Sequence, residues 1–214
     1  MTERIYSVVD DFIMNLDKGL QTVFGRPIPT DRPDPAINAP GADLTEAERR
    51  MSEGFMRVNH SGEVCAQALY QGQALTARST IVREKMAQSA WEENDHLVWC
   101  EDRIKELGGH LSYFNPFWYL GSFTLGVLAG IAGDKWSLGF VAETERQVVR
   151  HLDSHMKRLP VKDLKSRAIV TQMKEDELHH ATVAIETGGA ELPPVIRHLM
   201  TATSKVFTSL TYYL

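Results

Sequence analysis

The sequence predicts an all-α protein built on a bundle of four long helices, with one long crossover and extra helices at both ends. Glycine and proline are sparse between residues 44 and 107, as long helices require. Turn residues divide the rest of the chain into segments of helical length. One pattern of Glu and His occurs twice, which indicates two similar halves.

Composition narrows the class of protein. The chain has 214 residues, enough for one domain with a substantial core. Its formal net charge is −5, so we expect no nucleic acid among its partners. The two cysteines, Cys65 and Cys100, form no Cys-x-x-Cys motif and indicate buried thiols rather than a disulfide. The N-terminus lacks the basic start and apolar run of a signal peptide.

The first 42 residues differ from the rest of the chain. Apolar residues follow helical spacing over residues 3–24, and five prolines lie within residues 25–42. We expect a helix packed on the core, with an interfacial or partner-binding helix as the alternative, and then an extended arm or linker. The predicted division is an N-terminal helix and proline-rich arm in 1–42 and a helical bundle in 43–214.

Caps and breakers bound the remaining helices. Asp43 and Thr45 are suitable N-caps, paired glycines follow two of the helices, and Pro160 marks a break. The predicted helices run from Asp43–Thr45 to about Thr76, from Ile81 to Leu107, from the uncharged segment 111–133 to Arg158, from Val161 to Thr187, and from Pro193-Pro194 to near Leu210.

The repeated pattern is a lone glutamate, about thirty residues, and then Glu-x-x-His. The two members of each pair lie three residues apart, which places both side chains on one face of a helix. Each member of the first Glu-x-x-His pair is separated from its counterpart in the second pair by the same number of residues. The two lone glutamates are separated by nearly that number. The six residues are Glu63, Glu93, His96, Glu145, Glu177 and His180.

The same spacing predicts two antiparallel hairpins. Residues at equal height in a hairpin are equidistant from its turn, so the glutamates of each half should flank a turn at their midpoint. These midpoints are position 78 in the first half and position 161, beside Pro160, in the second. The segment between His96 and Glu145 is too long for a short turn and is typical of the long crossover in ferritin-like bundles.

Four such helices would bring four carboxylates and two imidazoles to one level, the ligand pattern of a carboxylate-bridged two-metal site. Two divalent ions would balance the four negative charges, which are costly to bury otherwise. Ligands of this kind without thiolate favour iron or manganese over structural zinc. We expect the four glutamates to be the catalytic residues, with Glu93 and Glu177 bridging the ions because each lies beside a histidine ligand.

Other ligand registers stay open. Asp176 and His179 share the three-residue spacing, and Glu143 competes with Glu145, although the common displacement of the two copies favours the chosen set. We expect four acidic neighbours to face solvent or to support the ligands from outside: Glu92, Asp95, Glu175 and Asp176.

Three further histidines are weaker candidates. His60 precedes Glu63 by three residues and is either a support for that ligand or an ordinary hydrogen-bonded residue, the latter being favoured. His151 and His155 have the spacing of a zinc-binding pair, but no Glu-His motif surrounds them.

Residues 111–133 carry no charged side chain. The segment is long enough for a membrane span, but it contains Pro116 and four glycines. A true span would also remove from the bundle the helix that carries Glu145. We therefore favour a buried or membrane-facing segment, whose aromatic residues between Phe114 and Tyr119 contact a lipid surface or a lipid-like substrate.

Several stretches together are specific to one known family. They are Asn59-His60-Ser61-Gly62-Glu63, Tyr70-Gln71-Gly72-Gln73, Trp91-Glu92-Glu93-Asn94-Asp95-His96, Glu145 through His151, and Glu175-Asp176-Glu177-Leu178-His179-His180. From about residue 44 to residue 214 the chain resembles the demethoxyubiquinone hydroxylases of ubiquinone biosynthesis. The family's six metal ligands map onto the six residues chosen above.

The resemblance implies a ferritin-like, O₂-dependent di-iron monooxygenase that hydroxylates the ring of a polyprenylated benzoquinol, demethoxyubiquinol. We accordingly expect two iron ions as the cofactor, an electron donor such as NADH, and a membrane surface that supplies the substrate. We expect a peripheral protein on the cytoplasmic face of the bacterial cell membrane, acting as a homo-oligomer or with other ubiquinone-biosynthesis proteins.

Two other functions use a similar arrangement of ligands. An iron-storage protein with a ferroxidase centre would form a large soluble shell and need no lipid. A manganese catalase is also built on a four-helix carboxylate site, and metal analysis with a peroxide assay would identify it. A membrane scaffold without activity is least favoured, because it leaves six convergent ligands unexplained.

Overall fold

The computed structural model describes residues 8–30 and 32–214, and this part of the chain contains seven helices and no strand. The helices are α1 (Val8–Phe24), α2 (Glu46–Thr76), α3 (Thr80–Glu106), α4 (Asn115–Ile131), α5 (Asp134–Arg158), α6 (Leu164–Glu186) and α7 (Pro194–Tyr213). The predicted all-α bundle of ferritin-like type is confirmed. Residues 3–7 of the predicted first helix lie outside the described residues.

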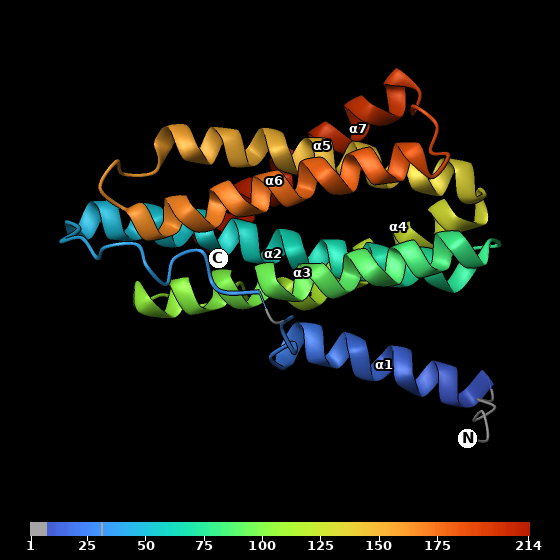
Figure 1. The fold of residues 1–214 in the computed structure, drawn as a ribbon, viewed down its shortest axis with the longest axis horizontal. Coiled ribbons are helices and arrows are strands. Elements are labelled where there is room, and N and C mark those ends of the chain that lie inside the picture. The colour runs from blue at the N-terminus through green and yellow to red at the C-terminus, as the bar shows by residue number, and fades with distance from the viewer. Residues whose placement is uncertain (1–7, 31) are drawn as a thin grey trace.

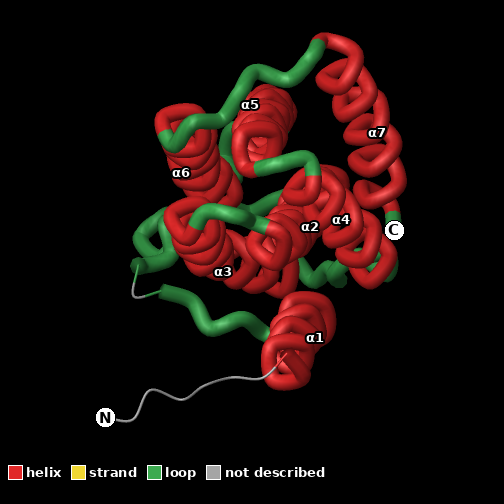
Figure 2. Tube along the Cα trace, turned by 90° about the vertical axis from the view of Figure 1, so that its right-hand side faces the viewer, coloured by secondary structure: helices red, strands yellow, loops and turns green. Residues whose placement is uncertain are grey.

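Two antiparallel hairpins form the bundle (Figure 1). Residues 77–79 join α2 to α3, and residues 159–163 join α5 to α6. These turns contain the two midpoints that the sequence predicts, positions 78 and 161. Because α3 packs on α6 and α2 on α5, the four helices enclose one core, while α1, α4 and α7 pack around it (Figure 2).

The ends of the helices follow from local chemistry. Thr45 caps α2 through a reciprocal capping box, in which its hydroxyl accepts from the Glu48 amide and the Glu48 carboxylate accepts from the Thr45 amide. Asp163 caps α6 by accepting from the Ser166 amide, so this helix begins slightly later than predicted. Gly108 and Gly188 follow α3 and α6 with positive φ angles of 75° and 110°.

The structure corrects the prediction of one helix from the uncharged segment to Arg158. Gly133, at a φ angle of 108°, separates α4 from α5. An L side chain rarely adopts this conformation, so the glycine allows a turn that reorients the chain. The uncharged segment is therefore a separate helix of 17 residues, and it supplies the long crossover. Among the described residues, no helix is both long and apolar enough to cross a bilayer.

Close approach of two backbones holds α4 against α2. A Cβ atom on Gly126 would lie 2.4 Å from the Leu69 carbonyl oxygen, and one on Gly72 would lie 2.4 Å from the Phe123 carbonyl oxygen. Only glycine permits this packing, in which Gly126 and Gly130 are buried. The opposite face of α4 exposes large apolar side chains, including those of Phe117, Leu120 and Leu128.

Apolar clusters pack the bundle at two levels. One contains Phe55, Trp99, Ile104, Leu152 and Ile169, and the other contains Ala66, Tyr70, Met86, Leu138 and Ala184. Along each of the four bundle helices, the predicted ligands lie between the residues of these two clusters. The ligands therefore form a polar layer that apolar packing closes above and below.

The N-terminal segment covers the side of the bundle. α1 packs on α2 and α4, and it exposes Ile13, Leu16 and Leu20 on its other face. The proline-rich arm then crosses α3 and α6, and it buries Ala36 in the first apolar cluster. Both cysteines are free thiols; Cys100 is buried and Cys65 half-buried.

Replacing Gly126 with Ala should destabilise the protein by about 1–3 kcal/mol, because the new methyl group overlaps the α2 backbone. Gly121→Ala on the same helix is the matched control, since a Cβ atom there meets nothing within 4 Å. We expect the control to be neutral or stabilising by up to about 1 kcal/mol. Urea denaturation followed by circular dichroism would measure both, and an equal effect of the two substitutions would contradict the packing described here.

Candidate metal centre

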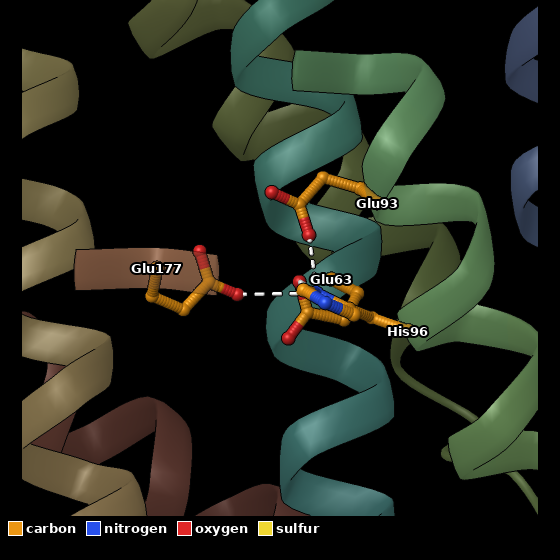
Figure 3. A group of neighbouring side chains, drawn as sticks. All are labelled: Glu63, Glu93, His96 and Glu177. Carbon is orange, nitrogen blue, oxygen red and sulfur yellow. Dashed lines mark hydrogen bonds and ion pairs between the residues drawn. The ribbon is translucent and has the colours of Figure 1, made fainter. Parts of the chain in front are cut away.

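All six predicted ligands lie in one buried layer of the bundle. α2 carries Glu63, α3 carries Glu93 and His96, α5 carries Glu145, and α6 carries Glu177 and His180. None of these side chains is more than 4 % exposed. Figure 3 shows four of them, with Glu93 and Glu177 directed at the ring of His96 from two different helices.

Glu93 and Glu177 each span both histidines. The Glu93 oxygens lie 2.7 Å from His96 Nδ1 and 2.9 Å from His180 Nδ1. The Glu177 oxygens lie 3.2 Å from His96 Nδ1 and 3.4 Å from His180 Nδ1. Each carboxylate thus presents one oxygen to each imidazole, an arrangement compatible with a carboxylate that bridges two ions.

The two remaining glutamates lie at opposite ends of this central group. A Glu63 oxygen lies 3.9 Å from His96 Nδ1, and ligand atoms of Glu63, Glu93, His96 and Glu177 all fall within 4.8 Å of one another. Glu145 interacts electrostatically with Glu177, Glu93 and His180, and one of its oxygens accepts a hydrogen bond of 2.5 Å from the Tyr70 hydroxyl. The arrangement therefore offers one glutamate and one histidine on each side of a central pair.

The chemistry of the donor atoms fits metal ions. Several buried atoms of the group make no hydrogen bond of acceptable geometry, although charged neighbours lie close to most of them: Glu93 Oε1, Glu145 Oε2, both oxygens of Glu177, and His180 Nδ1. A buried polar atom without a partner is costly, and a cation bound among these atoms would remove that cost. Carboxylate oxygens and imidazole nitrogens without sulfur are typical ligands of iron and manganese.

Protons compete with cations for this site. Burial raises the pKa of Glu63 and of Glu145 well above the ordinary value, and the neighbouring carboxylates Glu177 and Glu93 raise it further. Burial by itself lowers the pKa of His96, but Glu93 and the surrounding carboxylates raise it well above the usual value. A metal ion that binds here would therefore release protons, and its affinity would fall as the pH falls.

The outer nitrogen of each predicted ligand histidine lies beside a carboxylate from the opposite hairpin. His96 Nε2 lies 2.8 Å from Asp176 on α6, and His180 Nε2 lies 2.8 Å from Glu92 on α3. Such a partner orients an imidazole and directs its other nitrogen at a metal. The displacement that relates the two Glu-x-x-His pairs also relates Glu92 to Asp176, so the repeat contains the signal that identifies both residues.

The side chains of the competing registers lie away from the centre of the buried layer. Asp176 contacts the outer side of His96, and His179 is exposed. Glu143 accepts hydrogen bonds from Gln147 and Arg150 on its own helix, away from Glu145. Of the other acidic neighbours, Glu175 is exposed, while Asp95 is fully buried under the arm.

The other candidate histidines have separate partners. His155 Nδ1 lies 2.8 Å from the Asn59 side-chain oxygen, and His151 Nε2 lies 3.3 Å from the Ser204 hydroxyl, so the two do not share a site. His60 is buried, and no hydrogen-bond partner is found for its Nδ1 among the described residues. Sequence reasoning missed the role of Tyr70 as the partner of Glu145, because no spacing rule connects them.

Known proteins resemble the chain over its whole length. A family model described as "Ubiquinone biosynthesis protein COQ7" matches residues 50–211. A protein of Nitrosococcus oceani is 58 % identical over 214 residues, covering 100 % of both chains. Relatives from Nitrosomonas europaea and Acinetobacter baumannii are each 54 % identical, over 96 % and 99 % of this chain and 98 % and 100 % of their own. All three relatives are named 3-demethoxyubiquinol 3-hydroxylase.

The metal-free protein should lose stability in acid partly through His155. Burial lowers the pKa of this residue to about 3, below its ordinary value of 6.5. Below pH 6.5 His155 is protonated in the unfolded chain but stays neutral in the folded protein. The free energy of unfolding therefore falls as the pH drops from 6.5 towards 3. His155→Gln should reduce the loss between pH 7 and pH 4.5 by on the order of 2 kcal/mol. Urea denaturation at the two pH values measures this, and parallel losses in variant and wild type would contradict it.

Glu177→Ala should abolish binding of both metal ions, because Glu177 faces both histidines. Glu175→Ala is the matched control, since Glu175 is exposed on the same helix. Metal analysis after anaerobic loading with ferrous ion should find two ions per chain in the wild type and in the control. A Glu177→Ala protein that retains two ions would refute the ligand assignment.

Proposed function

The chain belongs to the COQ7 family of ubiquinone biosynthesis proteins, and from this membership we infer that it is a 3-demethoxyubiquinol 3-hydroxylase. The reaction adds a hydroxyl group to the ring of a quinol, and it consumes O₂. The rival functions drawn from the ligand pattern, an iron store and a manganese catalase, are set aside because the relatives are hydroxylases.

We propose that the six buried ligands hold two iron ions, with Glu93 and Glu177 bridging them. Glu63 and His96 would complete the coordination of one ion, and Glu145 and His180 would complete that of the other. The observation that carries this proposal is that both central carboxylates present one oxygen to each histidine. Bound iron supplies the activation of O₂ that the protein's own side chains cannot perform.

The protein's own residues set the environment of this chemistry. The apolar clusters on both sides of the ligand layer exclude water from it. The Tyr70 hydroxyl holds Glu145 by a hydrogen bond, so this carboxylate keeps one orientation. Asp176 and Glu92 orient the two histidines from outside.

A cavity beside Tyr70 offers a place for the quinol ring. Its volume is about 260 Å³, and it lies between α1, α2 and α3. Tyr70 lines it together with the amide side chains of Gln67, Gln71 and Asn94 and with apolar residues such as Met86. Amides can hydrogen-bond to the oxygens of a quinol, and Tyr70 separates the cavity from Glu145. The Tyr119 hydroxyl of α4 donates to Gln71, so the aromatic start of α4 lies near this cavity.

The protein is proposed to bind the surface of the bacterial cell membrane on its cytoplasmic face. A polyprenylated substrate dissolves in lipid, so the enzyme must reach a membrane to obtain it. The exposed apolar side chains of α4 and α1 support this placement, among them Phe117, Leu120, Leu16 and Leu20. An electron donor such as NADH must supply the reducing equivalents for the reaction with O₂.

Deletion of the gene should cause a quinone precursor to accumulate that is one ring oxygen short of the hydroxylated product. The wild-type gene and a Glu175→Ala gene should restore ubiquinone, whereas Glu177→Ala should not. Cells supplied with isotopically labelled O₂ should carry the label in the new hydroxyl group, as mass spectrometry of extracted quinones would detect. Label that enters from water instead, or accumulation of a different precursor, would contradict the proposed reaction.

A further inference from the structure

The proline-rich arm is attached to the two helices that carry the Glu-x-x-His pairs. Arg26 forms a two-pronged ion pair with Asp102 on α3, at 2.6 and 2.7 Å. The Asn94 side chain donates to the Ile28 carbonyl oxygen at 3.0 Å. Ala36, further along the arm, packs against the core. These contacts hold the arm in one path over the outer surface of α3 and α6.

Asp95 accepts three hydrogen bonds from the arm. This residue precedes His96 and is fully buried. Its carboxylate accepts hydrogen bonds from the Thr30 amide at 2.6 Å, from the Thr30 hydroxyl at 2.6 Å and from Arg32 Nε at 2.7 Å. The arm thus satisfies a buried charge on α3, and displacement of the arm would leave that charge unpaired.

Arg32 also reaches across to α6. Its Nη1 lies 2.9 Å from the same Asp176 oxygen that lies 2.8 Å from His96 Nε2. The guanidinium is centred 5.2 Å from the Trp99 ring, which limits its movement. One planar group therefore bridges Asp95 on α3 and Asp176 on α6, as the fork of an arginine can and the point charge of a lysine cannot.

The two ligand histidines differ in this support. Glu92, the partner of His180, receives its second hydrogen bond from Gln88, one turn earlier on its own helix. Asp176, the partner of His96, receives one from Gln172 on its own helix and one from Arg32 of the arm. The arm therefore supports the partner of His96 by a direct hydrogen bond, whereas Arg32 acts on Glu92 only by a longer-range electrostatic interaction.

We propose that Arg32 is a positioning residue for His96, acting through Asp176, and that the arm controls the occupancy of one of the two metal sites. This inference rests on the proposed two-metal site. With Nδ1 of His96 bound to a metal, Nε2 carries the hydrogen and donates it to Asp176. Arg32 fixes the Asp176 carboxylate, which in turn fixes the plane of the imidazole ring.

Stepwise binding of ferrous ion under anaerobic conditions tests the inference, with the two dissociation constants as the readout. Arg32→Ala should lower the affinity for one ion by about 10- to 100-fold and leave the affinity for the other ion near the wild-type value. Asp176→Ala should lower the affinity for the same ion. The double variant Arg32→Ala/Asp176→Ala should bind that ion no more weakly than Asp176→Ala alone. Arg26→Ala is the matched control, because it removes an ion pair of the same arm that touches no ligand. It should bind both ions normally.

Glu92→Ala identifies which ion is affected. Glu92→Ala should lower the affinity for the ion held by His180. Combined with Arg32→Ala, it should lower the affinity for both ions. Arg32→Lys keeps the charge but can reach only one of the two carboxylates, so its effect should be intermediate. This milder variant also serves if Arg32→Ala fails to fold.

Three outcomes would overturn the inference. The first is an Arg32 variant that binds both ions as the wild type does. The second is an Arg32 variant that weakens both ions equally, as a general loss of stability would. The third is additivity of Arg32→Ala and Asp176→Ala, which would show that Arg32 does not act through Asp176. A wild-type chain that fails to bind two ions would instead refute the proposed function, and the inference with it.

Discussion

Neutralisation of buried charge is the constraint on which the rest of this structure depends. Four helices each bring a carboxylate to one level of a core whose other layers are apolar. Such groups cannot remain together unless cations, protons or hydrogen bonds balance them. The two histidines, the Tyr70 hydroxyl and the proposed ions all balance or hydrogen-bond these carboxylates. A bundle with only apolar residues at this level would be easier to fold but would have no site.

The segments outside the four-helix core support the same layer. α4 closes one side of the bundle by direct backbone contact with α2, which Gly72 and Gly126 permit. The arm closes another side by pairing with Asp95 and Asp176, the neighbours of proposed ligands on α3 and α6. Each covering segment thus acts on helices that carry proposed ligands. On the side of the arm, the polar residues Asp95 and Asp176 connect it to the buried site.

Much of the site could be predicted because its geometry is local and repeated. Three-residue spacing on a helix and equal distances from a turn require no knowledge of tertiary contacts, and they identify all six residues of the layer. The break at Gly133 could not be predicted with the same means, since glycine within an apolar run is compatible with a continuous helix. Gly133 nevertheless has a positive φ angle, at the junction of α5 with α4, which packs against α2.

The sequence by itself determined the four-helix bundle, its two hairpin turns and the six side chains of the ligand layer, because helical periodicity and turn chemistry act over a few residues. Only the tertiary structure decided which groups support that layer. Arg32 lies 63 residues from Asp95 and 144 from Asp176, and Tyr70 lies 75 residues from Glu145. No local pattern links such distant positions, so their contacts arise only when the packed helices bring them together.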